Sequence, residues 1–328
     1  LQPLLDAREV RSRLDAVAEL RAELGPLDDL RALLKGVYDV ERLVGRIGLG
    51  SANGRDLRAL GQSLSILPAL RDTLSTKTSS LLATLHDSLD TCEDVVDLVG
   101  RAGHEEPPIT LRDGRLIRDD YNADLDDLRD VLANGKERIA ALQEAEREST
   151  GINSLKVGYN QVFGYYIEVT RANVPNVPED YIRKQTLANA ERYITPELKE
   201  FEEKILTAQE RILDLEYDLF LQVREQVKDE IPRIQRAAAI LAMLDFLAAM
   251  AYIAVKNNYA KPEVDDTDAL FIKSGRHPVV EQLVTHEGFV PNDTHLNADQ
   301  EQLQVITGPN MAGKSTYLRQ VALISLMA

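Results

Sequence analysis

Two stretches of the chain carry apolar residues at alternating steps of three and four. The first stripe consists of Leu125, Leu128, Leu132, Gly135, Ile139 and Leu142, and the second of Leu198, Phe201, Ile205, Ala208, Ile212, Leu215 and Leu219. A mean spacing of about 3.5 residues is typical of a seam between two helices. Thr195 as N-cap and Pro196 in the first turn mark where the second helix begins. Each stripe could also be the core face of a bundle helix. Their similar length on either side of one insertion favours an antiparallel pair, roughly 45 Å long for about 30 residues.

The insertion between these stripes changes period. Residues 154–160 and 164–170 are β-branched and aromatic with partial alternation, and the tripeptide 161–163 separates them. A Pro-rich loop follows at 173–180, and 181–193 resembles a short helix or turn region with basic and amide side chains. The pattern therefore predicts a small β-rich module at the tip of two helical arms.

The rest of the chain divides into a helical part and a mixed part. Residues 1 to about 115 predict helices separated at 24–29, 48–56 and 103–110. A strongly apolar helix is expected at 237–258. Strand and turn signals then begin, which places a boundary near Asn258.

The string GPNMAGKST at 308–316 fits the phosphate-binding pattern G-x-x-x-x-G-K-[ST]. Gly308 and Gly313 permit the tight turn that aims backbone N–H groups at phosphate oxygens, and Lys314 reaches the outer phosphates. Ser315 would ligate Mg²⁺. The pattern requires a strand before it and a helix after it, and the sequence predicts these at 303–307 and 315–328.

Composition excludes several classes of protein. The 328 residues are 44% hydrophobic, with a single cysteine, Cys92, and five histidines without H-x-x-x-H spacing. This argues against disulfides and metal clusters and is consistent with a reducing compartment. A fully apolar stretch of about 18 residues is missing from the sequence, which argues against a membrane span. The opening LQPLLDAREV does not resemble a leader peptide.

The net charge of −16 does not by itself exclude a nucleic-acid partner, because phosphate contacts are local. Residues 150–195 carry five basic and four acidic side chains and are the segment least repulsive to phosphates. Arg183, Lys184 and Arg192 could contact a phosphate backbone, and Gln185 and Asn189 could add neutral donors. A solvated polar face would have the same composition, so both interpretations stay open.

Four separated segments, 155–170, 183–206, 275–281 and 307–328, together resemble the MutS family of DNA mismatch repair ATPases, in that family's order. The resemblance covers nearly the whole chain. It implies a mainly α fold: a helical core with long antiparallel lever helices, a small β-rich clamp at their tip, and the beginning of an α/β P-loop ATPase domain. The implied layout is 1–137 and 199–258 for core and lever, 138–198 for the DNA-gripping clamp, and 259–328 for the start of an ABC-type ATPase domain.

The resemblance also implies site residues and partners. ATP or ADP with Mg²⁺ would be bound by Gly308, Pro309, Asn310, Met311, Ala312, Gly313, Lys314, Ser315 and Thr316, with Phe289 stacking on adenine, Val290 beside it and Ser315 as metal ligand. Ala312 stands where many members have glycine. Candidate DNA-binding residues are Lys156, Asn160, Arg171, Arg183, Lys184, Gln185, Asn189 and Arg192. The implied partners are mismatched double-stranded DNA, a second copy of the chain and a MutL-type protein, in the cytoplasm and without a membrane.

The family's mismatch-recognition and connector domains have no counterpart in these residues, nor has the acidic strand that completes the ATPase site. We therefore expect the chain to be a middle section of a longer polypeptide, with negligible ATP hydrolysis by itself. Three alternatives stay open. One is a MutS paralogue that acts on recombining or branched DNA. Another is an SMC-type structural ATPase, which is disfavoured because the helical arms precede the P-loop and are short. The third is a helical scaffold only.

Overall fold

The computed structural model describes residues 4–160, 164–284 and 288–328, and these form two compact units. One unit contains 37–66 and 91–238, and the other contains 1–36, 67–90 and 239–328. The helix α10 (Ile231–Lys256) belongs to both. Most of the described elements are helices, and the two small sheets are both antiparallel, which confirms the expectation of a mainly α fold.

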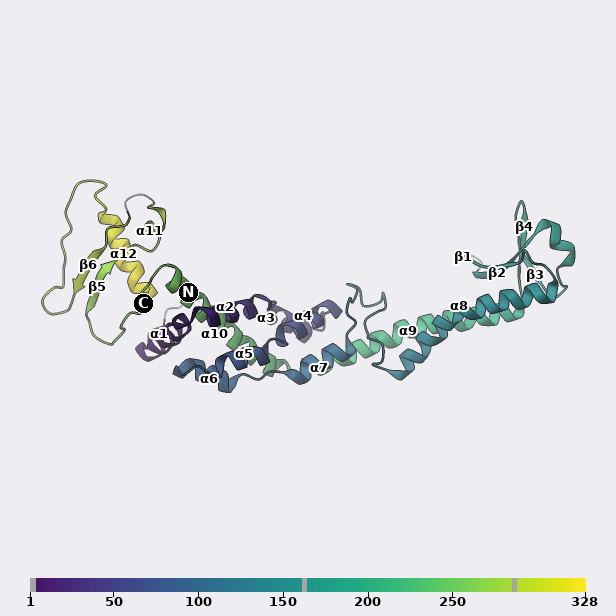
Figure 1. The fold of residues 1–328 in the computed structure, drawn as a ribbon, viewed down its shortest axis with the longest axis horizontal. Helices are drawn as coiled ribbons and strands as arrows, with labels where there is room; N and C mark the ends of the chain where they lie inside the picture. The colour runs from purple at the N-terminus through teal and green to yellow at the C-terminus, as the bar shows by residue number, and fades with distance from the viewer. Residues whose placement is uncertain (1–3, 161–163, 285–287) are drawn as a thin grey trace. The chain divides into compact units, whose positions relative to one another are not determined.

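Two long helices, α8 (Ala123–Thr150) and α9 (Pro196–Asp229), lie side by side in the first of these units (Figure 1). Every residue of the two apolar stripes is buried or half-buried, while most positions between them are exposed. The shared seam predicted from the spacing is therefore confirmed. Thr195 caps α9 by accepting from the Leu198 N–H at 3.2 Å, and Asn122 caps α8 by accepting from the Leu125 N–H at 3.0 Å.

A four-stranded antiparallel sheet connects the end of α8 to the start of α9. Its strands are β1 (Lys156–Asn160), β2 (Gly164–Thr170), β3 (Ile182–Thr186) and β4 (Ala190–Ile194), in the order β1-β2-β4-β3. We call this the clamp sheet. Between β2 and β3 lies a 3₁₀ turn, η1 (Arg171–Asn176).

The expectation of a short helix or turn region at 181–193 is wrong, because this segment forms the β3–β4 hairpin. Tyr181 and Tyr193 bury their rings in the core under the sheet, and the Leu187 N–H closes the turn onto the Ala190 carbonyl at 2.8 Å. Burial of the two rings and the hairpin ladder outweigh the helix preference of the intervening Leu, Ala and Glu residues.

The inner face of the clamp sheet packs on the ends of both long helices. Its core consists of Ile152, Leu155, Ile167, Val169, Tyr181, Tyr193 and Leu198, with Leu142 of α8 packed against it. Each buried aliphatic side chain contributes about 1.5–3 kcal/mol to stability. The sheet is therefore held to the helices by a core of its own.

The helices at the base of the same unit are α3 (Val40–Gly48), α4 (Gly54–Leu64) and α7 (Glu93–Ala102). Asn53 and Asp56 form a capping box that starts α4. Gly61 lets α4 and α7 approach closely, because a Cβ there would lie 3.1 Å from a Val99 methyl.

The other unit contains α1 (Ala7–Ala22), α2 (Leu24–Lys35), α5 (Leu67–Leu74), α6 (Ser80–Ser88) and the second part of α10. Breaks predicted at 48–56 and 103–110 are confirmed, whereas the break predicted at 24–29 lies at Glu23, because α2 already begins at Leu24. Pro26 lies in the first turn of α2, where its missing N–H would have no intrahelical partner in any case.

Residues 259–328 form β5 (Leu270–Gly275), α11 (Val280–Leu283), β6 (Asn292–Leu296) and α12 (Lys314–Met327), with β5 and β6 antiparallel. The helix expected at 315–328 is confirmed. The strand expected at 303–307 is wrong: this segment has no ladder partner among the described residues, and Val305 is 79% exposed. An apolar, β-branched run becomes a strand only beside another strand that accepts its hydrogen bonds.

The apolar helix α10 is the one described helix long and apolar enough to span a membrane, with a mean hydropathy of 2.2 over its best window. This helix does not meet the criterion of a fully apolar stretch of about 18 residues, because Asp245 interrupts it. Leu244, Leu247 and Ala251 are fully buried, and a core helix passes the same test. One such helix is weak support for a membrane span.

Candidate nucleic-acid interface and phosphate-binding loop

The outer face of the clamp sheet carries a polar row that crosses all four strands. Cross-strand register places Lys156 opposite Glu168, Glu168 opposite Arg192, and Arg192 opposite Gln185. Side chains of alternate residues point to opposite faces, so this row faces away from the buried core. Three of the predicted DNA-binding residues are thus brought together on one surface.

Arg192 is bound within this row. Its Nε donates to Glu168 Oε2 at 3.0 Å, its Nη1 donates to Gln185 Oε1 at 3.0 Å, and its guanidinium lies 4.0 Å from the centroid of the Tyr166 ring. Tyr166 can lie there because Gly158 has no side chain; a Cβ at Gly158 would be 2.8 Å from the ring. With 18% of its side chain exposed, Arg192 is engaged by protein groups on three sides.

Lys184 has the opposite surroundings. The register between β3 and β4 shifts between Arg183 and Gln185, so Lys184 is the extra residue of a β-bulge on an edge strand. The side chains of Lys184 and Lys156 are both exposed, and neither ammonium makes a hydrogen bond or ion pair within the part of the chain that the structure describes. Arg183 is 64% exposed and lies 3.7 Å from Glu191. The two lysines are therefore free for an anionic ligand, whereas Arg183 is exposed but already lies beside a carboxylate.

The remaining candidates lie elsewhere on the sheet. Arg171 and Asn189 meet at one end, where the Arg171 N–H donates to the Asn189 carbonyl at 3.1 Å and Arg171 Nη1 donates to the Ala188 carbonyl at 3.3 Å. Asn160 ends β1 opposite Gly164 and is half-buried.

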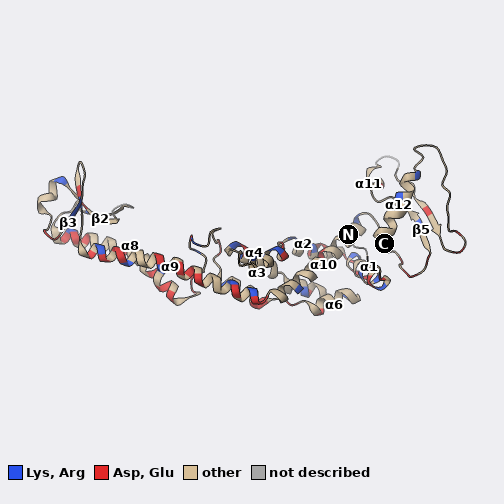
Figure 2. Ribbon diagram, turned by 180° about the vertical axis from the view of Figure 1, so that it is seen from behind, with Lys and Arg blue, Asp and Glu red and all other residues tan. Residues whose placement is uncertain are grey.

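The helices that carry the clamp sheet are acidic. α8 has eight acidic and four basic residues, and α9 has ten acidic and five basic residues. The ribbon in Figure 2 is red at acidic positions along both helices and blue at basic positions on β3. A phosphate backbone would be repelled by the helices, so the free cations of the clamp sheet are the favourable contacts in this unit.

Polar contacts that were not predicted from the sequence also fix the clamp sheet to α8. The Tyr181 hydroxyl donates to Glu146 at 2.6 Å, and the Val157 N–H donates to Gln143 at 2.9 Å. Burial first, and then the Glu146 carboxylate, raise the pKa of Tyr181 well above its usual range, so the phenol stays a donor. Gln143 and Glu146 are three residues apart, so their side chains lie on the same face of α8. This spacing is the one sequence signal that could have suggested these contacts.

The second site is the loop before α12. Gly308 and Gly313 have φ of +150° and +88°, which residues with a side chain rarely adopt, so both glycines are required by the backbone as predicted. No side chain caps the N-terminus of α12, and its first N–H groups are left for a ligand. Ala312 fits beside Gly308, since a Cβ at Gly308 would lie 3.7 Å from its methyl.

Lys314 folds back on the loop, and its Nζ donates to the carbonyls of Gly308 and Pro309 at 2.6 Å each. The uncapped helix terminus, the two glycines and this ammonium form a donor set that suits phosphate oxygens. The described residues contain no group of three Asp, Glu, His or Cys side chains that could hold a metal ion.

Phe289 and Val290 precede β6, and Tyr317 ties that strand to α12. The Tyr317 hydroxyl is 2.8 Å from Thr294 Oγ1 and donates to the Asp293 carbonyl at 3.4 Å. Phe289 is half-buried, while Val290 is 77% exposed. The candidate adenine contacts and the helix after the loop thus belong to one small substructure.

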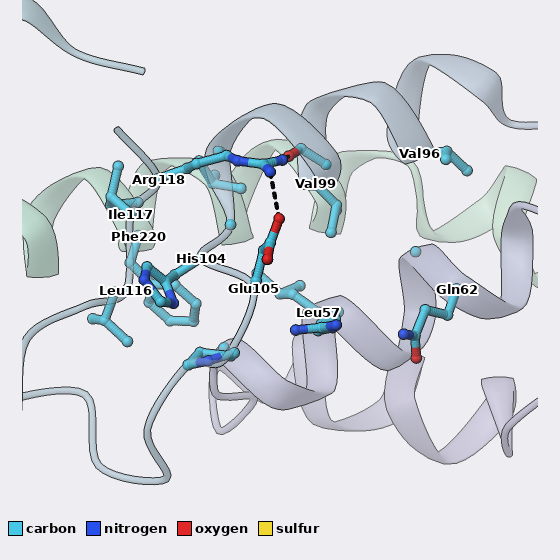
Figure 3. A pocket seen from close by; sticks show the side chains of 18 of the residues that line it. Leu57, Gln62, Val96, Val99, His104, Glu105, Leu116, Ile117, Arg118 and Phe220 are labelled. Atoms are coloured by element: carbon cyan, nitrogen blue, oxygen red, sulfur yellow. Dashed lines mark hydrogen bonds and ion pairs between the residues drawn. The ribbon is translucent and has the colours of Figure 1, made fainter. Parts of the chain in front are cut away.

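A cavity of about 280 Å³ lies between α4, α7 and α9 and contains none of the predicted site residues (Figure 3). Leu57, Val99 and Phe220 give it an apolar wall, and the Arg118–Glu105 ion pair, with N and O 2.6 Å apart, lies at its rim.

The backbone of segment 116–117, which lines this cavity, is held by charged side chains of both long helices. Glu216 of α9 accepts from the Leu116 N–H at 3.0 Å and from Arg129 of α8 at 2.6 Å, and Arg129 donates to the Ile117 carbonyl at 2.8 Å.

Comparison with known families gives two matches on this chain. Residues 120–211 match MutS family domain IV, and residues 304–328 match MutS domain V. The first match contains α8, the clamp sheet and the start of α9, and the second contains the phosphate-binding loop and α12.

Curated relatives extend the match over the whole chain. The chain is 49% identical to the DNA mismatch repair protein MutS of Caldicellulosiruptor saccharolyticus over 327 residues, which are 100% of this chain and 38% of that protein. It is 52% identical to the MutS of Geobacillus kaustophilus over 328 residues, which are 100% of this chain and 36% of that protein. The chain thus spans a little more than a third of the length of these relatives. With its paired helices, its clamp sheet and these matches, the chain belongs to the MutS family of DNA mismatch repair proteins.

Proposed function

We propose that the complete protein is an ATPase that binds mismatched double-stranded DNA as a dimer, with ATP binding at 308–316 coupled to the clamp sheet through the lever helices. The observation that carries this proposal is an identity of 49–52% over the whole chain to proteins named DNA mismatch repair protein MutS. The free cations of the clamp sheet and the glycine geometry of the loop support it.

In this proposal the clamp sheet contacts the DNA backbone and reads no sequence. Lys184, Lys156 and Arg183 contact phosphates, while Arg192 keeps the outer face in its observed arrangement. Arg171, Asn160, Gln185 and Asn189 add donors at the margins of this surface.

At the loop, the N–H groups of 308–316 and the Lys314 ammonium bind the phosphates of ATP or ADP, and Phe289 stacks on adenine with Val290 beside it. Mg²⁺ held by Ser315 and the phosphates would neutralise charge during phosphoryl transfer. A MutL-type partner and a cytoplasmic location complete the proposal.

Fluorescence anisotropy of the complete polypeptide on labelled duplexes tests this function. We expect tighter binding to a duplex with one G·T mismatch than to the matched duplex, and faster release on addition of ATP. Lys314→Ala should abolish the ATP effect and leave nucleotide-free binding unchanged, whereas Arg319→Ala, which alters an exposed residue of the same helix, should behave like the unsubstituted protein. Equal affinity for both duplexes with preference for a branched junction would instead identify a paralogue acting on recombining DNA.

A further inference from the structure

The C-terminal end of α10 is closed by two kinds of contact. The first is a Schellman motif: Asn258 has φ +50°, its N–H donates to the Val255 carbonyl at 3.2 Å, and the Tyr259 N–H donates to the Ala254 carbonyl at 2.9 Å. This motif leaves the carbonyls of Asn257 and Asn258 without partners from the helix itself.

Arg276 supplies those missing partners from a distant part of the chain. It follows β5 directly, and its Nη2 donates to the carbonyls of Asn257 at 3.0 Å and Asn258 at 2.9 Å. The carboxyl end of a helix carries partial negative charge, so a guanidinium there is favourable as a charge as well as a donor.

Arg276 is itself oriented by a carboxylate. Its Nη1 lies 3.0 Å from Glu281 Oε2, and the Glu281 side chain is only 8% exposed. Burial first, and then the neighbouring Glu281 carboxylate, raise the pKa of Tyr259. Gln282 adds a second connection, donating from Nε2 to Asn257 Oδ1 at 3.2 Å.

The same segment contacts the helix that begins at the phosphate-binding loop. A Cβ at Gly275 would lie 2.8 Å from Gln320 Nε2, so β5 touches α12 at the residue before Arg276. Gln320 is fully buried. One short segment, 275–282, therefore contacts α12 on one side and the end of α10 on the other.

We propose that Arg276, held by Glu281, is the positioning residue that joins the substructure carrying the phosphate-binding loop to the end of α10. This inference rests on the proposed function: ATP bound at 308–316 alters DNA binding only if movement of α12 and β5 reaches α10 through this joint. Without Arg276, the end of α10 keeps its Schellman motif and the single side-chain hydrogen bond from Gln282, and the effect of ATP on DNA binding is weakened.

The test compares Arg276→Gln with Lys273→Gln in the complete polypeptide. Lys273 lies three residues earlier on β5, and its exposed side chain makes no hydrogen bond or ion pair within the described ranges, so its substitution is the matched loss of charge. The readouts are nucleotide affinity, nucleotide-free DNA affinity, the ATP-induced increase in DNA dissociation rate, and hydrogen exchange of the amides at 257–260.

For Arg276→Gln we expect both affinities within about twofold of the unsubstituted protein, about tenfold less ATP-induced acceleration of DNA release, and faster exchange at 257–260 (a tenfold change corresponds to about 1.4 kcal/mol of coupling). Arg276→Lys should restore part of the acceleration, since one ammonium donor can still reach these carbonyls. Lys273→Gln should match the unsubstituted protein.

An unchanged ATP response in Arg276→Gln would overturn the inference. If Arg276→Gln does not fold, Glu281→Gln is measured in the same way, and misfolding of both variants would also overturn it, because the contact would then be structural only. If the unsubstituted protein binds DNA and ATP without any effect of one on the other, the proposed function fails, and this inference fails with it.

Discussion

At the residue scale, Lys184 and Arg192 carry the same charge only a few residues apart on one hairpin, yet their electrostatic surroundings differ. Arg192 is neutralised by Glu168 and bonded to Gln185, whereas Lys184 projects from a bulge into solvent. A cation already paired within the protein has less to gain from a phosphate than a free one. In the proposed function, the phosphate contacts therefore fall mainly to Lys184 and Lys156.

The first prediction concerns these two lysines. The double variant Lys156→Ala, Lys184→Ala should weaken DNA binding about equally for all sequences and lower the slope of log affinity against log salt by about 2, because each lost phosphate contact removes about 0.9. Anisotropy titrations at several salt concentrations measure this. The control Lys204→Ala removes a lysine that pairs with Glu200 on α9 and should leave the slope unchanged. A sequence-dependent loss would contradict backbone contact.

The second prediction concerns the buried carboxylate of Glu216, which is 2% exposed and bonded to Arg129 and to the Leu116 N–H. Glu216→Gln should lower the free energy of unfolding by about 2 kcal/mol. This loss is smaller than for a buried ion pair in which the remaining charge has no other partner, because Arg129 keeps its contact with Asp119.

Urea denaturation followed by circular dichroism measures the loss. The matched control is Glu225→Gln on the same helix, whose side chain is 61% exposed; we expect a change below about 0.5 kcal/mol. Equal effects of the two substitutions would show that the buried network is not stabilising.

At the element scale, the seam between α8 and α9 depends on one small residue. Gly135 is buried, and a Cβ there would lie 3.1 Å from Ile205 Cδ1 and 3.7 Å from the Phe201 ring. The helices can be this close because α8 presents no side chain at that position. Glycine within a helix otherwise costs about 1 kcal/mol relative to alanine, so its presence here is explained by packing.

The third prediction follows from this contact. Gly135→Ala should leave stability nearly unchanged, because the gain in helix propensity offsets a tight contact that the flexible end of Ile205 can relieve. Gly135→Leu should destabilise the pair by about 1–3 kcal/mol through overpacking. Thermal unfolding at the helical circular dichroism signal distinguishes the two. A Gly135→Leu variant as stable as the unsubstituted protein would mean that the helices do not share this seam.

Sequence patterns predicted elements correctly where those elements depend only on residues close together in the chain. The stripes of α8 and α9, the Thr195 cap and the helix after the phosphate-binding loop depend on spacing and on neighbouring residues only. Periodicity failed at 181–193 and 303–307. In the first, burial of Tyr181 and Tyr193 selects a hairpin; in the second, an apolar run has no neighbouring strand within the described residues.

At the scale of the whole molecule, the large number of carboxylates makes stability depend on pH. Burial raises the pKa of Glu19, but N–H and hydroxyl donors of Thr78 and Ser79 outweigh it and lower the pKa to about 2. In the unit that contains 91–238, the hydrogen bond from Arg233 lowers the pKa of Asp94. Both units therefore contain carboxylates whose charged form is favoured by folding.

The fourth prediction is the resulting acid dependence. Since the folded-state pKa of Glu19 lies below its ordinary value of 4.5, its contribution is present above pH 4.5 and is lost as pH falls towards 2. Glu19→Gln should lower the free energy of unfolding at neutral pH by about 1–2 kcal/mol, allowing for partial exposure.

Urea titrations from neutral pH to about pH 2 would check this sign. The curves of Glu19→Gln and the unsubstituted protein should converge at the acid end, while Glu9→Gln, an exposed change on the same helix α1, should track the unsubstituted protein throughout. A constant gap between the first two curves would show that Glu19 does not titrate in this range.

By itself the sequence determined the two helical arms, the inserted β-rich module, the glycine positions of the loop 308–316 with the helix after it, and the family, because periodicity, caps and motifs are properties of neighbouring residues. Tertiary structure decided which basic side chains of the clamp sheet are already paired, since cross-strand register places Arg192 beside Glu168 and leaves Lys184 in a bulge. It also decided where Arg276 acts, because the carbonyls that it caps lie almost twenty residues away, at the end of another helix. Contacts between distant residues depend on the folded path of the chain, and local sequence patterns do not determine that path.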